Sequence, residues 1–236
     1  MNVYHENKLR ILTWNVGVFQ PLTYLKLLGI KLKNHHIEHE FFYKHNGPLV
    51  SEYITKLNPD IIILQEILSL DDVDNIPILQ FYPHKKLLKA WGDNNILIAS
   101  RMEFSHETQN FFHILHFEQY TVIPLHLNSF SAEKRLHESS VLSEIVKTQV
   151  KPVIAIGDTN IWKRNNRFLF KNDKKAYSQI TSILPEASSY IVSTHYFGFG
   201  IDKVFTSPGM ITECFSDKER GVFMDHYPVY VDVEKD

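Results

Sequence analysis

Cysteine is almost absent from this chain, and its scarcity limits what the protein can be. Cys214 is the sole cysteine among 236 residues, so an internal disulfide is impossible and metal sites built from several thiolates are excluded. The sequence also lacks an N-glycosylation sequon, a P-loop and a Gly-x-Ser-x-Gly turn. Nucleotide chemistry of the P-loop kind and serine-hydrolase chemistry on such a turn are therefore not indicated.

Long apolar runs and an excess of charge are missing as well. No stretch approaches the roughly 20 apolar residues that a membrane-spanning helix needs, and the polar segment Met1–Arg10 lacks the apolar core of a signal peptide. We expect a cytoplasmic protein. The 25 Lys and Arg residues nearly balance 27 Asp and Glu residues, for a net charge of -2, so any nucleic-acid-binding surface must be local.

What the chain does contain is enough apolar sequence for one sizeable core. The hydrophobic content is 44%, and no linker rich in Pro, Gly or Ser divides it, so we expect a single domain over residues 1–236. Apolar runs and turn residues predict a mixture of strands and helices, which indicates an α/β fold with sheets inside and helices outside. The predicted strands are Ile11–Asn15, Ile61–Leu64, Asn95–Ala99, Asn110–His116, Tyr120–Leu127, Val153–Asp158, Ile201–Phe205, Gly209–Phe215 and Tyr227–Val233.

The helices are predicted from apolar residues at helical spacing and from capping residues. Segments 48–57, 71–79 and 177–184 read as short helices, and 162–175 as a polar and basic loop. The clearest helix is Ser131–Val150, which Ser131 can cap, with Lys134, Arg135 and Glu138 expected on the outer face. Its inner face is expected to consist of Leu136, Val141, Leu142, Ile145 and Val146.

Polar side chains follow several of these predicted strands at the point where each strand ends. The most informative case is the apolar run Val153–Ile156, which ends in Gly157-Asp158-Thr159-Asn160. A single buried polar group without a partner costs several kcal/mol, so groups that converge on one pocket would satisfy one another. The other members of this set are Asn15, Gln65, Glu66, His126, Asp202, Asp225 and His226.

As a set, these residue types suit phosphoryl transfer, which depends on positioning, a metal ion and a base for water. Glu66 and Asp225 offer hard oxygen ligands for Mg²⁺. His226 beside a carboxylate such as Asp202 is a candidate base. Side chains that can donate to phosphate oxygens are Asn15, His126 and Asn160. Taken singly, each residue has an ordinary structural explanation, such as a turn, a strand cap or a satisfied core histidine.

The order of four motifs resembles the endonuclease/exonuclease/phosphatase superfamily over nearly the whole chain, from Ile11 to Val233. These motifs are Thr13-Trp14-Asn15, Leu64-Gln65-Glu66, Gly157-Asp158-Thr159-Asn160 and Asp225-His226-Tyr227-Pro228-Val229. They look most like the tyrosyl-DNA phosphodiesterase branch. The resemblance implies a four-layer α/β sandwich, in which helices flank two packed, mainly antiparallel sheets, and phosphoester cleavage that depends on Mg²⁺ or Mn²⁺.

The resemblance also implies a role for each matching residue. Asn15, Glu66 and Asp225 would form the metal site, and His126 would touch the scissile phosphate. Asp158 and Asn160 would orient the nucleophile and the phosphate, and Asp202 would act with His226 as the acid–base pair. Two positions depart from the usual pattern, because Met224 replaces a serine and Gly200 replaces an arginine. The missing arginine puts the contacts to the substrate phosphate in doubt.

The substrate is the least determined part of this interpretation, because one fold hosts many substrates. A basic run with interleaved aromatic residues follows the Asp158 turn and contains Trp162, Lys163, Arg164 and Arg167. Cations beside stacking rings favour DNA or RNA as the partner. The same cations suit anionic lipid headgroups. They also fit a plain solvated loop.

The apolar segment Pro21–Phe42 could line a lipid site or simply pack on the sheet. A sphingomyelinase-like or inositol-phosphate-type lipid phosphoesterase is therefore the alternative, followed by a catalytically silent binding module. No stable protein partner is indicated, and we expect a monomer.

Overall fold

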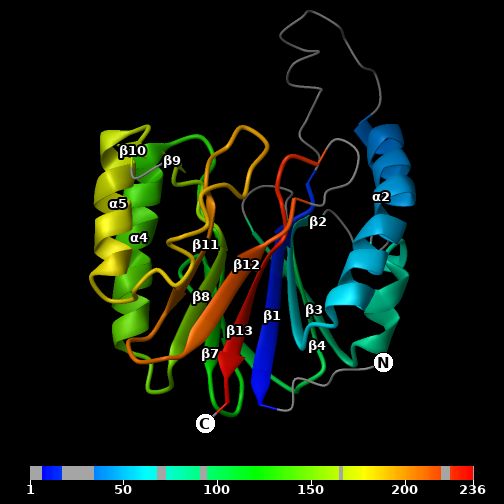
Figure 1. The fold of residues 1–236 in the computed structure, drawn as a ribbon, viewed down its shortest axis with the longest axis horizontal. Helices are drawn as coiled ribbons and strands as arrows, with labels where there is room; N and C mark the ends of the chain where they lie inside the picture. Colours follow the sequence, from blue (N-terminus) through cyan, green and yellow to red (C-terminus); the bar gives the residue numbers. More distant parts are fainter. Residues whose placement is uncertain are drawn as a thin grey trace, which may run out of the picture.

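The chain folds into two β-sheets packed face to face, with helices on both outer faces (Figure 1). This computed structural model describes residues 7–17, 35–67, 73–90, 95–164, 167–218 and 224–235, and only the backbone of residues 35–45. Much of the segment Pro21–Phe42, with its leucines, therefore lies outside the described residues. Within the described part, none of the helices has the length and apolar character needed to cross a membrane.

The first sheet has six strands in the order β12-β13-β1-β2-β4-β3, and only the β1–β2 pair is parallel. The chain enters this sheet, leaves it after β4, and returns to it with its last two strands. Its strands are β1 (Lys8–Asn15), β2 (Ile61–Ile67), β3 (His84–Lys89), β4 (Asn95–Ser100), β12 (Thr212–Ser216) and β13 (Val229–Glu234).

The second sheet has five strands in the order β11-β8-β7-β6-β5, and only the β7–β8 pair is parallel. Its strands are β5 (Ser105–Gln109), β6 (Phe112–His116), β7 (Thr121–His126), β8 (Val153–Asp158) and β11 (Asp202–Thr206). Each sheet thus contains one parallel pair, and each pair is joined by a helical crossover. The α/β sandwich with mainly antiparallel sheets agrees with the prediction.

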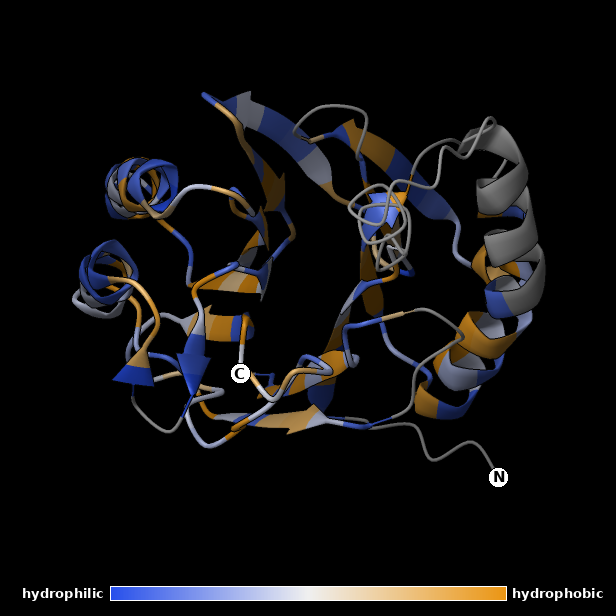
Figure 2. Cartoon of the chain, turned by 90° about the horizontal axis from the view of Figure 1, so that it is seen from above, coloured by the Kyte–Doolittle hydropathy of each residue, from blue (hydrophilic) through white to orange (hydrophobic). Residues whose placement is uncertain are grey.

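The remaining elements cover the outer faces. Helix α2 (His35–Leu57) and the 3₁₀ helix η1 (Pro77–Phe81) lie over the first sheet, and α4 (Ala132–Lys147) and α5 (Lys171–Thr181) lie over the second, as the view from above shows (Figure 2). A two-stranded hairpin, β9 (Lys163–Arg164) and β10 (Arg167–Phe168), precedes α5.

Three apolar layers hold these parts together. The middle layer lies between the sheets and includes Ile11, Ile63, Ile156 and Val231. The layers on either side pack the helices against the sheets. β1, β2 and β8 are buried along almost their whole length because they are covered on both faces. This explains why β2 and β8 begin with continuous apolar runs in the sequence.

The structure corrects several boundaries. β3 and β5 were not predicted; both are edge strands, and their polar sequences HKKLLK and SHETQ hide the strand pattern. The predicted helix at 48–57 is the second part of α2, which contains Pro48. The described part of segment 71–79 contains the start of η1. The basic loop predicted at 162–175 is the β9–β10 hairpin and the first turn of α5.

Helix α4 confirms the predicted cap and the exposure of Lys134, but not the other two residues of the predicted outer face. Ser131 accepts a hydrogen bond from the backbone nitrogen of Lys134 at 3.2 Å. Arg135 and Glu138 are buried, with about 1% exposed each, which contradicts the expectation that they face solvent. Arg135 pairs with Asp173 of α5, and Glu138 accepts from the backbone nitrogen of Asn128 at 2.8 Å. Burial raises the pKa of Glu138 to about 7.

Candidate active site

The polar residues predicted from the sequence meet at the carboxyl ends of the two parallel strand pairs. In the second sheet, Asp158 of β8 lies between two partners in register, His126 of β7 on one side and Asp202 of β11 on the other. In the first sheet, Asn15 ends β1 beside Gln65 of β2. The two sheets therefore present their polar strand ends to one another, because the carboxyl ends of parallel strands gather at one edge of a sheet.

Two glycines make room for this convergence. Gly157 has a φ of 142°, and a Cβ atom there would lie 2.2 Å from the backbone oxygen of Leu125. A side chain at Gly17 would place its Cβ only 1.8 Å from Oε2 of Glu66. The carboxylate of Glu66 thus occupies space that any other residue at position 17 would fill, and Glu66 itself has a positive φ of 63°.

Asn15 links two of the carboxylates. Its Nδ2 donates to Oε1 of Glu66 at 3.0 Å and to Oδ2 of Asp158 at 3.2 Å. Its Oδ1 accepts from the backbone nitrogen of Gly17 at 2.9 Å, which fixes the orientation of the amide. Asn15 therefore acts here as a donor that holds Glu66 and Asp158 together, and a direct metal contact through its oxygen stays a prediction.

His226 lies at the centre of the acidic residues. Its Nδ1 is 2.9 Å from Oδ2 of Asp202, and its Nε2 is 3.7 Å from Oδ2 of Asp158 and 3.8 Å from Oδ1 of Asp225. Burial by itself lowers the pKa of His226, but the carboxylates of Asp202 and Asp158 outweigh it and raise that pKa to about 10. The imidazole therefore carries a proton at neutral pH.

Asp158 is almost fully enclosed, with about 1% exposed. Burial raises its pKa, and the charge of Asp202 adds to that effect, although His226 opposes it. Its Oδ1 accepts from the backbone nitrogen of Asn160 at 2.7 Å. Asn160 adopts a positive φ of 48°, and its Nδ2 donates to the backbone oxygen of Leu127 at 3.0 Å. The Asp158–Asn160 turn is thus locked by its own hydrogen bonds.

His126 and Asp225 close the two ends of the network. Nε2 of His126 is 3.6 Å from Oε1 of Glu66, and its Nδ1 is buried with no hydrogen-bond partner among the described residues. Oδ2 of Asp225 lies 3.2 Å from Nε2 of His195. The predicted catalytic and metal residues thus form one connected set: Asn15, Glu66, His126, Asp158, Asn160, Asp202, Asp225 and His226.

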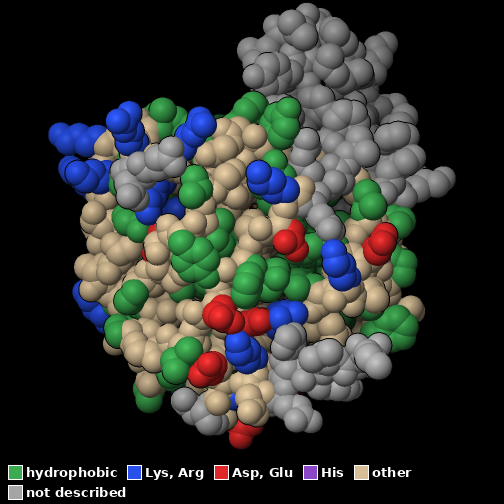
Figure 3. Space-filling model, viewed as in Figure 1, with side chains coloured by type: hydrophobic (Ala, Val, Ile, Leu, Met, Phe, Trp, Pro, Cys, Tyr) green, Lys and Arg blue, Asp and Glu red, His purple; other side chains and the backbone are tan. Residues whose placement is uncertain are grey.

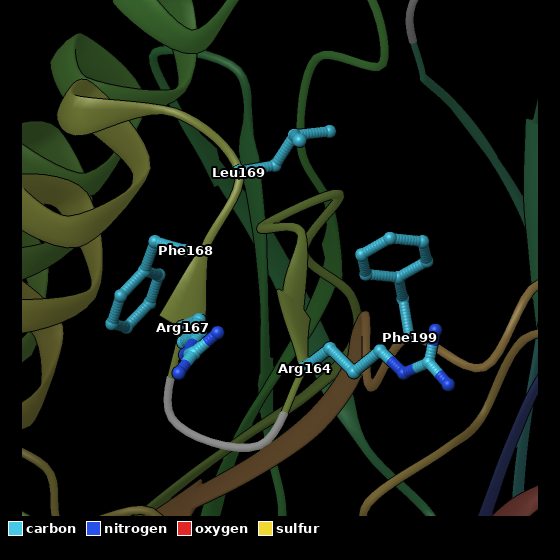
Figure 4. A pocket seen from close by; sticks show the side chains of 5 residues that line it. All are labelled: Arg164, Arg167, Phe168, Leu169 and Phe199. Carbon is cyan, nitrogen blue, oxygen red and sulfur yellow. The ribbon is translucent and has the colours of Figure 1, made fainter.

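The predicted substrate-binding residues lie in or next to the β9–β10 hairpin, in two different settings. Arg164 and Arg167 line a hollow of about 560 Å³ together with Phe168, Leu169 and Phe199 (Figure 4). Lysine and arginine side chains gather at this corner of the molecule, near β9, β10 and α5 (Figures 1 and 3).

The other two predicted substrate-binding residues are tied to the protein itself. Lys163 turns inward, and its Nζ lies 3.0 Å from the hydroxyl of Tyr177 and 3.3 Å from Oε2 of Glu186. The ring of Trp162 packs edge-on against Phe199 at 5.0 Å and against His195 at 5.5 Å. Because His195 in turn contacts His226 at 5.0 Å, this row of rings joins the hollow to the catalytic centre.

His195 lies within this cluster, and the sequence interpretation missed it. It is buried, with about 3% exposed, and contacts both Asp225 and His226. It lies in an irregular segment between α5 and β11, so no strand end drew attention to it. The ligand atoms of His195, Asp225 and His226 lie within 4.8 Å of one another, as do those of Asp158, Asp202 and His226.

Comparison with known proteins gives a consistent result. The sequence model of the Endonuclease/Exonuclease/phosphatase family matches residues 12–220, whereas no curated protein sequence matches the chain. Among similar solved structures, an AP endonuclease from Archaeoglobus fulgidus is 16% identical with a TM-score of 0.64, and the match covers 94% of this chain and 98% of that one. Truncated TDP2 from Caenorhabditis elegans is 16% identical with a TM-score of 0.65, and the match covers 96% of this chain and 98% of that one. A mannosyl-6-phosphatase from Bacteroides thetaiotaomicron is 14% identical with a TM-score of 0.66, and the match covers 95% of this chain and 99% of that one. At these identities the likeness shows a common fold.

Proposed function

The chain belongs to the Endonuclease/Exonuclease/phosphatase family, and from this premise we propose that it is a metal-dependent phosphodiesterase acting on nucleic acid or a nucleic-acid adduct. Members of this superfamily hydrolyse phosphoester bonds. The observation that carries the proposal is the buried row Asp158–His226–Asp202, in which a charged imidazole lies between two carboxylates at the end of the sandwich.

The chemistry of the donor set fits a divalent cation. Three carboxylates, those of Asp158, Asp202 and Asp225, surround one imidazolium, His226, and Asn15 links the Glu66 carboxylate to Asp158, so the site carries an excess of negative charge. Hard oxygen ligands of this kind suit Mg²⁺ or Mn²⁺. Glu66 and Asp225 would hold the ion, with Glu66 kept in place by Asn15. A bound ion would neutralise charge on the phosphate as the bond to the leaving group breaks.

The chain's own residues divide the remaining work. The raised pKa of His226 favours a role as a donor to the phosphate oxygens, where its charge stabilises the charge that develops. Asp158, whose pKa burial raises, is then the group that orients the attacking water and takes its proton. Asp202 holds the imidazole through Nδ1. His126 and Asn160, which lie beside Asp158 at this end of the second sheet, would contact the phosphate.

The hollow lined by Arg164 and Arg167 supports nucleic acid as the substrate class. Two guanidinium groups and the rings of Phe168 and Phe199 line one hollow, and cations with stacking rings suit a single strand with its phosphates and bases. The lipid alternative is supported by one exposed ring in the loop after β7, that of Phe130, which is 96% exposed. Its main support, the apolar segment Pro21–Phe42, lies largely outside the described residues.

The test is cleavage of labelled single- and double-stranded oligonucleotides in Mg²⁺, one of them with a 5′-phosphotyrosyl end. Wild type should cleave, and His226→Ala, Asp158→Ala and wild type in EDTA should lose activity by orders of magnitude. Arg164→Gln should raise KM with little change in kcat. Lys147→Gln, at the far end of α4, is the matched control and should leave KM unchanged.

Three outcomes would change the proposal. Hydrolysis of sphingomyelin vesicles without cleavage of any oligonucleotide would move the substrate class to lipids. Turnover of a simple aryl phosphodiester alone would retain the reaction and reject nucleic acid. If no phosphoester is hydrolysed in Mg²⁺ or Mn²⁺, or if His226→Ala keeps full activity, the assignment as an enzyme of this kind is wrong.

A further inference from the structure

His195 is fixed beside the catalytic residues by the backbone on both sides of it. Positions 195 and 226 form an antiparallel bridge. The backbone nitrogen of Tyr196 donates to the backbone oxygen of Asp225 at 2.7 Å, and that of Tyr227 donates to Thr194 at 2.8 Å. The segment that carries His195 is therefore paired with the segment that carries Asp225 and His226, and its position does not depend on the imidazole.

The hydrogen bonds of His195 determine which ring nitrogen carries the proton. The backbone nitrogen of Phe197 donates to Nδ1 at 3.2 Å. A backbone N–H can only donate, so Nδ1 must accept and has no proton, and the neutral ring carries its hydrogen on Nε2. Nε2 is 3.2 Å from Oδ2 of Asp225 and therefore donates to that carboxylate.

The same argument separates His195 from the residues that would bind the ion. A ligand role through Nε2 needs a free lone pair on that atom, which would move the proton to Nδ1. The proton on Nδ1 would then face the N–H of Phe197. The cluster of His195, Asp225 and His226 looks like a three-ligand metal site by distance alone, but the tautomer makes His195 a donor within it.

The donation from His195 fixes how Asp225 is presented. Oδ2 of Asp225 faces His195, and its Oδ1 lies 3.8 Å from Nε2 of His226. The imidazole is also held in place, edge-on to Trp162 at 5.5 Å and to His226 at 5.0 Å. The carboxylate is thus held in one orientation.

We propose that His195 is a positioning residue, which holds the Asp225 carboxylate through Nε2–H and so prepares it to bind the divalent cation. The inference rests on the proposed function for the role of Asp225. Partners of this kind, which hold a metal ligand from behind, typically change metal affinity by about 10- to 100-fold when they are removed.

The test measures Mn²⁺ binding to the whole protein by calorimetry, without substrate. His195→Leu should weaken binding about 10- to 100-fold, whereas His195→Gln, which can still donate to Asp225, should bind close to wild type. His113 is a matched control, because it is buried outside the site and its Nε2 contacts the backbone oxygen of Lys89. His113→Leu should leave Mn²⁺ affinity unchanged.

A second measurement uses the wild type alone and does not depend on the folding of any variant. Nitrogen-15 NMR of the imidazoles should show His195 with a protonated Nε2 and an unprotonated Nδ1. The reverse tautomer would overturn the inference, and so would wild-type Mn²⁺ affinity in His195→Leu or equal losses in the leucine and glutamine variants. The variant Asp225→Asn tests the metal site separately. If it binds Mn²⁺ as tightly as wild type, the proposed role of Asp225 as a metal ligand is wrong, whatever the His195 variants show.

Discussion

The buried ion pair between α4 and α5 provides the sharpest test of the packing. Nε of Arg135 lies 2.8 Å from Oδ1 of Asp173, and the two side chains are 1% and 0% exposed. Nη1 of Arg135 also donates to the backbone oxygen of Asn128 at 2.8 Å. The pair therefore ties both outer helices to the loop that follows β7 and His126.

Asp173→Asn keeps the shape of the side chain and removes its charge. The guanidinium of Arg135 then stays buried without its counter-charge, and breaking such a pair costs about 3–5 kcal/mol of unfolding free energy. For a chain of this size, about 2–4 °C of Tm are lost per kcal/mol. We therefore expect a Tm lower by about 6–20 °C.

The assay is thermal and urea unfolding followed by circular dichroism. The matched control is Glu144→Gln, which breaks the exposed pair Lys147–Glu144 (56% and 71% exposed) and should change stability by less than about 0.5 kcal/mol. The double variant Arg135→Met with Asp173→Leu should recover most of the loss, because two apolar side chains need no partner. A loss below about 1 kcal/mol in Asp173→Asn would refute the reasoning.

Two further predictions concern the site itself. Gly17→Ala should displace the Glu66 carboxylate, since the new Cβ would lie 1.8 Å from its Oε2. We expect turnover to fall about 100-fold with little change in Tm. Unchanged turnover would show that activity does not require this position of the Glu66 carboxylate. His226, with a pKa of about 10 against about 6.5 when unfolded, should contribute stability that is complete below pH 6.5 and is lost as pH rises towards 10. Urea unfolding in EDTA at both pH values measures this contribution as the difference between wild type and His226→Gln, and equal pH dependence in the two proteins would contradict the raised pKa.

Much of the fold could be predicted from the sequence because central strands such as β2 and β8 are apolar over most of their length. The strands β1, β2 and β8 are covered on both faces, so consecutive residues in them are buried. β3 and β5 could not be found in this way, because they are edge strands with mostly polar sequences. The prediction that Arg135 and Glu138 face solvent was wrong for a similar reason. A charged residue predicts exposure unless its partner is known, and Asp173 is far away in the sequence.

The site residues were predictable because their spacing along the chain follows the strand ends. The resemblance to the endonuclease/exonuclease/phosphatase superfamily is confirmed, and the predicted residues do converge. What the sequence could not give is the electrostatic state of the set. His226 reads as a base when it stands beside one carboxylate, whereas the three carboxylates around it in the structure raise its pKa. His195 belongs to no motif in the sequence, and only its contacts with Asp225 and Phe197 in the structure indicate a role for it.

The return of the chain to its first sheet determines when activity can arise during synthesis. β1 opens that sheet, the chain then builds the whole second sheet, and β12 and β13 complete the first. Asp225 and His226 directly precede β13, which pairs with β1. A nascent chain that has emerged only as far as β11 already holds Asn15, Glu66 and Asp158 but lacks Asp225 and His226. The proposed site is therefore complete only when β13 has docked on β1.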